Sequence, residues 1–431
     1  MRMAEMIRET RSVCPVCMKN LPAKLLRDQD GVISLKKECP EHGIFTAPVW
    51  RGCLDFDRWA ANSSPLKVGQ GMSCPGQCGL CPEHESESCC VLLEVTKRCN
   101  LHCQFCFASG GEQETEPPLD TLKASIRDIV KKCGRPLLQL SGGEPTLRDD
   151  LPELVRYARE AGCSYVQVNT NGLRLAEDPR YAEALAEAGL DIVFLQFDGT
   201  DDQIYQTLRG HPLLEKKLRA IEVCGRLHMG VTLVPTVVPG INDQDLGALI
   251  CLGQSLMPAV RGIHFQPVSY FGRYPGIPGE DRRFTLDELL AAISRQTELP
   301  IESFRPSRCD HPLCGFHGAF VENSAGKLCP VSSGSQTMGR TSAGTNREYV
   351  ARHWRRSASD AAPSALSEEM DFDTFLYLVR NKSLTLSAMA FQDAMNLNIE
   401  RLHRCSLHVY SDGAVKPFCG AYLTPVTLTR S

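Results

Sequence analysis

Between residues 91 and 268 the chain alternates short apolar runs with longer amphipathic segments. The apolar runs are VLLEVT (91–96), LLQLSG (137–142), YVQVNTN (165–171), IVFLQFD (192–198), VTLVPTV (231–237) and IHFQPV (263–268). They are short and rich in β-branched and aliphatic residues, as buried parallel strands are, and segments such as LDTLKASIRDIVKKC between them have helical periodicity. Six such units in about 180 residues predict an α/β fold with a partial (β/α)6 barrel of the TIM type.

The chain outside this pattern divides into three further regions. We predict a cysteine-rich N-terminal region over residues 1–73, a short cysteine segment over 74–90, the barrel over 91–270 and a C-terminal extension over 271–431. The first 90 residues contain few aliphatic runs, so bound metal is expected to replace a hydrophobic core there.

The C-terminal extension has a mixed pattern. Residues 332–365 are rich in Ser, Gly and Arg and predict a surface loop or linker. Residues 368–397 carry Phe, Leu and Met at helical spacing and predict a helix that packs in the core or lines a substrate pocket. Residues 401–422 predict a hairpin with SDG as its turn. His403, His408 and Tyr410 in this segment are candidates for ligand or proton-transfer roles.

Composition and charge argue against a general nucleic-acid-binding protein and against a membrane-spanning one. Hydrophobic residues make up 42% of the chain and charged residues 23%, which is typical of a globular protein. The net charge of −4 gives no general attraction to nucleic acid. The first residues are polar and lack the apolar stretch of a signal peptide, and no apolar run reaches the ~20 residues of a membrane span. We expect a cytoplasmic protein without a transmembrane segment, and peripheral contact with a membrane stays open.

Cysteine is unusually abundant, with 21 residues among 431. The cytosol keeps thiols reduced, so metal or cluster ligation is a better explanation than disulfides. Most of them fall in closely spaced groups that run from Cys14 to Cys106 and from Cys309 to Cys419. The isolated cysteines, expected to be small buried apolar residues, are Cys133, Cys163, Cys224 and Cys251.

Chemically distinctive motifs follow four of the predicted strands. CNLHCQFCF follows the first strand and holds Cys99, Cys103 and Cys106, and SGGEPT, NTNG and QFDG follow the next three. Functional residues of such barrels concentrate at the carboxyl ends of the strands. Three thiolates can hold three irons of a [4Fe–4S] cluster and leave the fourth iron open. A structural zinc knuckle would favour paired CxxC motifs instead.

CNLHCQFCF after the first strand, with SGGEPT after the second, resembles the radical S-adenosylmethionine (SAM) superfamily. The resemblance implies that Cys99, Cys103 and Cys106 hold a catalytic [4Fe–4S] cluster whose open iron binds SAM. In this superfamily one-electron reduction cleaves SAM to a 5′-deoxyadenosyl radical, which abstracts hydrogen from the substrate. A low-potential electron donor of the flavodoxin or ferredoxin type is implied as a partner.

The same motifs supply candidate contacts to SAM. Gly142 and Gly143 permit close backbone approach, and Glu144 offers a carboxylate to the SAM ammonium group. Phe105 is expected to shield the cluster and to lie near the adenine. Candidate contacts to the SAM ribose or to the substrate, in motifs that also form turns, are Asn169, Gln196 and Asp198.

The flanking motifs narrow the resemblance to one subgroup. Four segments are similar to motifs of archaeal tetraether lipid synthases and pterin-methylating radical SAM proteins. They are CPVCMKNLPAKLL, CPGQCGLCPEH, CDHPLCGF and DGAVKPFCGAY. The subgroup implies a mononuclear, rubredoxin-like or zinc-ribbon-like site at Cys14, Cys17 and Cys39, with His42 or Cys53 as the fourth ligand. Iron and zinc both suit such a site.

The subgroup also implies two auxiliary [4Fe–4S] clusters. The candidate ligands of the first are Cys74, Cys78 and Cys81, completed by Cys89, Cys90 or a tail cysteine. The candidate ligands of the second are Cys309, Cys314 and Cys329, with Cys405 and Cys419 as the remaining thiols.

Three functions stay open at this point. The favoured hypothesis is a radical SAM enzyme that abstracts hydrogen from an unactivated C–H bond of a lipid chain or similar apolar substrate and forms a C–C bond. The second is SAM-dependent methylation of a pterin-like metabolite. The third is a multi-zinc binding protein without catalysis, which a colourless preparation would indicate.

Overall fold

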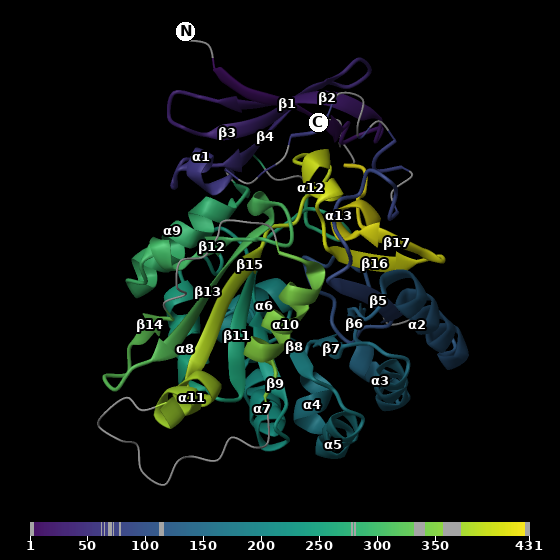
Figure 1. Ribbon diagram of the computed structural model, residues 1–431, viewed down its shortest axis with the longest axis vertical. Helices are drawn as coiled ribbons and strands as arrows, with labels where there is room; N and C mark the ends of the chain where they lie inside the picture. Colours follow the sequence, from purple (N-terminus) through teal and green to yellow (C-terminus); the bar gives the residue numbers. More distant parts are fainter. Residues whose placement is uncertain are drawn as a thin grey trace.

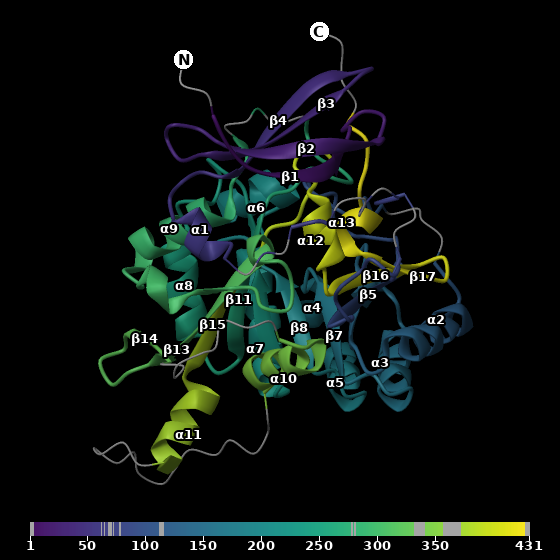
Figure 2. The same ribbon diagram turned by 45° about the horizontal axis from the view of Figure 1, so that its top comes forward.

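The computed structural model describes residues 4–61, 63, 65–67, 71, 73–76, 79–111, 116–276, 279, 282–331, 341–356 and 372–426. Two sheets organise these residues, a four-stranded antiparallel sheet and a large mixed sheet. The small sheet lies at one end of the molecule, next to the C-terminal helices α12 (Ile399–His403) and α13 (Phe418–Ala421) (Figures 1 and 2).

The small sheet consists of neighbouring strands in chain order. They are β1 (Glu5–Val13), β2 (Asn20–Arg27), β3 (Ile33–Cys39) and β4 (Gly43–Trp50), followed by the short helix α1 (Phe56–Trp59). Leu25, Leu35 and Trp50 are buried and belong to the main hydrophobic core of the protein. The expectation that metal replaces a core in this region is therefore wrong for the sheet itself.

The large sheet contains all six predicted barrel strands. They are β5 (Cys90–Thr96), β6 (Leu137–Gly142), β7 (Tyr165–Thr170), β8 (Ile192–Gln196), β9 (Gly230–Val234) and β11 (Val260–Pro267), with the two-residue β10 (Thr236–Val237) beside β11. These six strands are parallel and adjacent in this order. The predicted α/β barrel architecture is confirmed.

Helices cover the outer face of these strands. They are α2 (Leu119–Cys133), α3 (Leu151–Glu160), α4 (Leu173–Glu177), α5 (Pro179–Glu187), α6 (Asp202–Arg209), α7 (Leu214–Arg226), α8 (Leu246–Ser255) and α9 (Leu286–Thr297). In α2, for example, Leu122, Ile126 and Ile129 are buried at a spacing of one helical turn.

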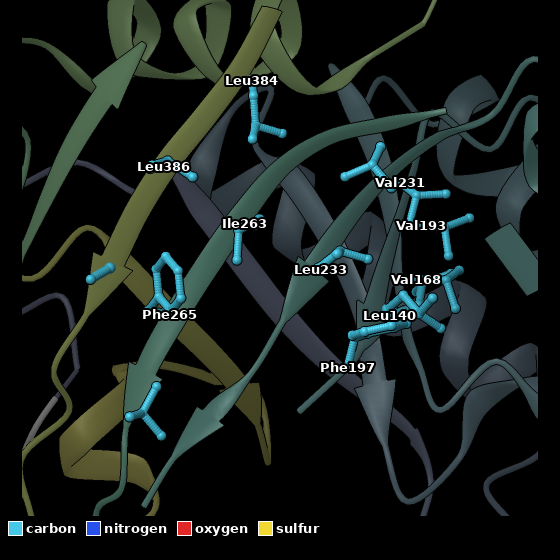
Figure 3. Packing of buried hydrophobic residues seen from close by; sticks show 14 of the residues in the cluster. Leu140, Val168, Val193, Phe197, Val231, Leu233, Ile263, Phe265, Leu384 and Leu386 are labelled. Atoms are coloured by element: carbon cyan, nitrogen blue, oxygen red, sulfur yellow. The ribbon is translucent and has the colours of Figure 1, made fainter. Parts of the chain in front are cut away.

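The core between strands and helices uses alternate strand positions. Val168 of β7, Val193 of β8 and Ile263 of β11 point to this core (Figure 3). The intervening positions therefore face the opposite, concave side of the sheet. Within the described residues, no helix is long and apolar enough to cross a membrane.

The C-terminal extension adds one parallel strand at each edge of the six. β15 (Ser383–Met389) pairs with β11, and β16 (Leu407–Ser411) pairs with β5 and forms the predicted hairpin with β17 (Ala414–Pro417). The prediction of one helix over 368–397 is wrong, because α11 (Phe372–Asn381) ends before β15 begins. Leu384, Leu386 and Ala388 alternate in the strand and fit the pleat.

Antiparallel strands complete the edge beyond β15. They are β12 (Arg305–Pro306), β13 (Gly315–Glu322) and β14 (Leu328–Pro330). In the sheet order, β12 and β17 are the last strands at the two ends.

A helix lies where a linker was predicted. Helix α10 (Ala343–Trp354) packs against β9, β11 and β15, and the rest of the predicted linker lies outside the described residues except for 341, 342, 355 and 356. A Cβ atom at Gly230 would come within 2.1 Å of the Trp354 carbonyl oxygen, so glycine permits this packing. The linker prediction is wrong for α10, whose Trp354 ring lies 5.7 Å from the ring of Phe194.

Candidate functional site

A cavity of about 360 Å³ lies on the concave side of the parallel strands. Cys99, Cys103 and Cys106 line it together with residues from the ends of β6, β7 and β8. The structure thus brings the predicted triplet beside most of the predicted SAM contacts. The contacts that line the cavity are Phe105, Gly142, Gly143, Glu144, Asn169 and Gln196.

The loop that carries the three cysteines is fixed by backbone hydrogen bonds. The Cys99 N–H donates to the Gly111 carbonyl at 3.0 Å, and Cys106 and Arg273 exchange two backbone hydrogen bonds of 2.9 Å. The Arg273 guanidinium also donates to the Cys103 carbonyl at 2.8 Å. Sequence reasoning missed Arg273, which lies 167 residues beyond Cys106 in a Gly/Pro-rich stretch.

The chemistry of the three thiols fits a cationic iron–sulfur cluster. The pKa of Cys99 is raised to about 12, mainly by burial and also by the nearby Glu144, Cys103 and Cys106. Three thiolates so close together repel one another unless a cation binds them. Because three local thiolates leave one iron of a cubane without a protein ligand, the set suits a [4Fe–4S] cluster that binds SAM.

The two glycines of SGGEP are required by close contact with the end of β5. A Cβ atom at Gly142 would lie 2.1 Å from the Thr96 carbonyl oxygen, and one at Gly143 would lie 2.2 Å from that of Arg98. Gly143 N–H donates to the Thr96 carbonyl at 2.8 Å, and Glu144 N–H donates to the Arg98 carbonyl at 2.7 Å. These contacts tie the motif to the strand that leads into the cysteine loop.

We expect Gly143→Ala to destabilise the fold by about 2 kcal/mol, because the added methyl group meets backbone rather than a movable side chain. Gly111→Ala is the matched control in the same loop region, since a Cβ there would meet nothing within 4 Å. Urea unfolding of both variants measures the difference. Equal stabilities would show that the loop adjusts to a Cβ at residue 143.

The Glu144 carboxylate lines the cavity but is held firmly by the protein. Its Oε1 accepts hydrogen bonds from the Thr146 N–H, the Thr146 hydroxyl and the Thr170 hydroxyl at 3.0, 2.7 and 2.6 Å. Its Oε2 accepts one from the Asn171 N–H at 2.6 Å. Oε2 keeps capacity for a further donor. The role of Glu144 toward the SAM ammonium group stays a prediction.

Asp198 does not line the cavity, and its role as a direct contact to SAM or substrate stays a prediction. Its carboxylate accepts from Arg209 Nη2 at 2.6 Å and Arg209 Nε at 2.7 Å, and both side chains are buried. Arg209 itself lines the cavity. Asp198 therefore positions Arg209, which places a buried cation beside the cysteine loop.

A buried lysine supports the same region. Lys217 of α7 is fully buried and donates to the Asn171 carbonyl at 2.5 Å and to Gln196 Oε1 at 2.7 Å. It fixes which end of the Gln196 amide is the oxygen. Sequence reasoning missed Lys217, although it occupies a buried position of α7 together with Ala220, Ile221 and Cys224.

The titration of Lys217 predicts a dependence of stability on pH. Burial lowers its pKa to about 7, whereas the pKa of a lysine in an unfolded chain is about 10.4. The unfolded chain therefore binds more protons between these two pH values. Stability therefore rises with pH across this window. From pH 7 to pH 9 we expect the wild type to gain about 2 kcal/mol relative to Lys217→Met. Urea unfolding at both pH values measures this gain, with exposed Lys216→Met as the control; equal pH slopes in all three proteins would contradict it.

The small sheet carries a set of metal ligands at one end. Cys14, Cys17, Cys39 and His42 each place a ligand atom within 4.8 Å of the others. Cys17 and Cys39 sulfurs lie 3.9 Å apart, and His42 Nδ1 lies 3.4 Å from Cys39 Sγ. Cys53, the alternative fourth ligand, is exposed and lies outside this group. The Cys3His set suits tetrahedral zinc.

The predicted second auxiliary set is not brought together. Cys314 directly precedes β13, whereas Cys329 pairs with Val321 six residues along that strand from Gly315, a separation of about 20 Å. Cys329 is exposed, and Cys309 instead hydrogen-bonds Cys89. The prediction that one cluster uses all three is wrong.

Several other cysteines lie beside residues that their sequence spacing did not predict. Burial raises the pKa of Cys405, and the thiols of Cys419 and Cys314 are close enough to raise it further. Cys89 and Cys90 line the cavity, and Cys78 lies outside the described residues. Among the isolated cysteines, Cys163 and Cys224 are buried as expected, Cys133 is half-buried and Cys251 is exposed.

The candidate residues of the tail separate into different environments. His408 is buried and contacts Ser88 and His84, and the Tyr410 hydroxyl donates to Asp128 on α2 at 2.8 Å. His403 lies 3.4 Å from Cys74 Sγ. None of these three lines the cavity.

Comparison with known proteins agrees with this arrangement. The radical SAM superfamily model matches residues 93–251, and the HMPTM N-terminal zinc ribbon domain model matches residues 6–51. The chain is 35% identical to the Fe-coproporphyrin III synthase of Methanosarcina barkeri over 47% of this chain and 49% of that protein. It is 34% identical to the probable GTP 3′,8-cyclase of Pyrococcus abyssi over 37% and 50%.

One relative matches almost the whole chain. The 7,8-dihydro-6-hydroxymethylpterin dimethyltransferase of Methanocaldococcus jannaschii is 32% identical over 474 aligned residues, which cover 96% of this chain and 93% of that protein. The match includes the zinc ribbon, the cysteine loop and the C-terminal extension. The chain is therefore a radical SAM enzyme and belongs to the family of this dimethyltransferase.

Proposed function

We propose that the enzyme methylates a pterin-like heterocycle held in the cavity, with hydrogen abstraction from a C–H bond as the step that starts the reaction. The observation that carries the proposal is the near full-length similarity to a protein described as a pterin dimethyltransferase. The lipid substrate favoured by the sequence has no comparable support among the relatives described above. The chemistry of the cavity wall adds to the argument.

Carboxamide side chains line the cavity from several neighbouring strands. Gln139 of β6 and Gln167 of β7 both donate to Asn169 Oδ1, at 2.7 and 3.1 Å. Gln196 of β8 and Gln266 of β11 line the same cavity. Each amide offers donors and an acceptor, which suits the alternating donors and acceptors along the edge of a pterin ring.

Aromatic rings line the cavity next to these amides. Phe194, His264 and Trp354 have ring centroids 5.4 to 5.8 Å apart. Burial lowers the pKa of His264 to about 4, so its imidazole is neutral near pH 7. Neutral aromatic walls favour a flat heterocycle through offset and edge-to-face contacts.

The roles of the chain's own residues follow from their positions. When bound at Cys99, Cys103 and Cys106, the cluster and SAM supply the one-electron chemistry that begins hydrogen abstraction. Arg209 and Glu144 place a cation and an anion at the wall beside this loop and suit the charged amino-acid part of SAM. A reductant of the flavodoxin or ferredoxin type is the proposed electron donor.

An alkyl chain is the second candidate substrate, because part of the wall is strongly apolar. Phe391 and Phe418 stack at 4.3 Å between centroids, and Phe271 lies 6.2 Å from Phe418. All three line the cavity on the side of the C-terminal extension. This wall suits hydrocarbon as well as a ring system.

Deuterium transfer discriminates the two candidates. The reconstituted enzyme is reduced with dithionite and supplied with SAM and either 6-hydroxymethyl-7,8-dihydropterin deuterated at carbon or a perdeuterated phospholipid. We expect deuterium in 5′-deoxyadenosine from the pterin. With a second SAM as the methyl donor, which leaves as S-adenosylhomocysteine, we also expect a mass gain of a methyl group on the pterin. Transfer from the phospholipid alone would overturn the proposal in favour of the alkyl substrate.

A further inference from the structure

Helix α10 lies across the amino-terminal ends of the barrel strands. In its first half, the Arg347 guanidinium donates to the carbonyl of Ser88 at 2.8 Å, two residues before β5 begins. Beyond its last residue, Arg355 Nε lies 3.2 Å from a carboxylate oxygen of Asp191, which directly precedes β8. A helix of 12 residues spans about 18 Å. Helix α10 therefore bridges from β5 to β8 at this end of the barrel.

One face of α10 forms part of the cavity wall. Asn346, Val350 and Trp354 line the cavity and follow one another at intervals of four residues, so they share one side of the helix. Glu348 and Arg352 are exposed on the other side. The candidate SAM contacts lie at the carboxyl ends of β6, β7 and β8. The inner face of α10 therefore closes the opposite end of the same cavity.

The ring of Trp354 projects from this face into the barrel. Its centroid lies 5.7 Å from that of Phe194 on β8 and 5.8 Å from that of His264 on β11. Two glycines make room for the residue. A Cβ atom at Gly230 would lie 2.1 Å from the Trp354 carbonyl oxygen, and one at Gly262 would lie 3.1 Å from Trp354 Nε1. The backbone of Trp354 thus packs directly on β9, and its indole packs on β11.

The space between this indole and the SAM side of the cavity is short. Phe194, which touches the indole side of the cavity, is two residues from Gln196 at the carboxyl end of β8. Two strand residues correspond to about 7 Å. A long chain that points along the barrel axis from the SAM side would therefore meet the Trp354 ring. Val350 and Asn346 continue this boundary along the helix toward β5.

We propose that α10 is the floor of the substrate cavity and that Trp354 limits the length of the substrate. The inference rests on the proposed function, because it concerns the substrate of that same site, and it favours a small heterocycle over a long alkyl chain. A packed ring that clashes with longer molecules discriminates against them without any new contact to the shorter one. Removal of the indole therefore relaxes the selection by length.

Equilibrium dialysis of the full-length, reconstituted and unreduced enzyme with SAM measures this selection. The ligands are 6-hydroxymethyl-7,8-dihydropterin and 7,8-dihydrofolate, which carries a much longer substituent on the same ring. We expect the affinity for dihydrofolate, relative to the shorter pterin, to rise about tenfold or more in Trp354→Ala. Trp59→Ala is the matched control and should keep the wild-type ratio. Trp59 does not line the cavity, and its ring lies 5.9 Å from that of Trp50.

A second pair of ligands tests the floor independently of any pterin site. Octanoate and palmitate differ in chain length alone, and the same dialysis gives their relative affinities. We expect palmitate to gain about tenfold or more relative to octanoate in Trp354→Ala. This gain, together with failure of the wild type to bind either pterin, would overturn the proposed function and leave the floor in place.

A further variant protects the test against misfolding of Trp354→Ala. Trp354→Phe keeps an aromatic ring against Phe194 and His264 but shortens the side chain. We expect it to raise both affinity ratios by less than Trp354→Ala does. A raised ratio for either pair of ligands supports the floor. Unchanged ratios for both pairs in every folded Trp354 variant would overturn the proposal, whether or not the pterins bind.

Discussion

Replacing Cys99, Cys103 and Cys106 together by alanine is expected to abolish SAM cleavage and to remove about four irons and four sulfides per chain. The three thiols line one cavity with Gly143 and Glu144, and they are the local donors there that can hold a cluster with an open iron. Zinc at Cys14, Cys17, Cys39 and His42 should be retained, because these ligands belong to a separate sheet.

The control must remove thiols without touching this loop. Cys163→Ala/Cys224→Ala does so, since both side chains are buried in the core between the barrel strands and their helices. We expect this control to keep its iron, sulfide and SAM cleavage at a lower stability. Formation of 5′-deoxyadenosine by the triple variant would place the SAM cluster elsewhere in the chain.

Asp198→Ala is expected to destabilise the protein by about 3–5 kcal/mol, because it leaves the Arg209 guanidinium buried without its carboxylate. Asp198 Oδ1 also accepts from the Thr236 N–H at 3.1 Å, so a backbone donor is lost too. Asp198→Ala/Arg209→Met should recover much of this stability, because it removes the unpaired charge. Urea unfolding measures all three proteins.

A surface ion pair gives the matched control for this prediction. Asp149 lies 2.7 Å from Arg174, a distance similar to that of the buried pair, but its side chain is 90% exposed. We expect Asp149→Ala to cost less than about 1 kcal/mol. If Asp198→Ala costs no more than Asp149→Ala, Arg209 gains access to water and the buried pair does not support the cavity wall.

The parallel strands were predictable because their sequence signal is local. LLQLSG corresponds to β6 residue for residue, since a short apolar run between turns suits a buried strand. Within this run the side chains alternate between the two faces of the sheet: Leu138 and Leu140 pack in the core, and Gln139 lines the cavity. The sequence alone does not show which face is which. The carboxamide wall could therefore not be recognised before the faces of the sheet were known.

The errors arose where distant contacts determine structure. Residues 383–389 resemble a continuation of the preceding helix, but pairing with β11 makes them a strand. Helix α10 contains few long apolar side chains, and its packing against β9 depends on the missing side chain of Gly230. Short-range periodicity does not report such pairings.

The cysteine sets show the same limit. Cys99, Cys103 and Cys106 lie within one loop, so sequence spacing was enough to group them. Cys314 and Cys329 are also close in sequence, yet β13 and β14 separate them. His403 lies 329 residues from Cys74 and has no sequence signal for this contact. Lys217 was also missed, although its position in the sequence gave a signal. It lies on the apolar face of its helix, where a lysine predicts a buried hydrogen-bond partner.

The most direct test of the account is the reaction of the wild-type enzyme with SAM. Protein reconstituted anaerobically with iron and sulfide is reduced with dithionite, supplied with SAM, and analysed by mass spectrometry for 5′-deoxyadenosine. The account predicts that 5′-deoxyadenosine forms only in the reduced, cluster-containing protein and depends on Cys99, Cys103 and Cys106. Intact SAM, with zinc but no sulfide bound to a folded protein, would contradict it.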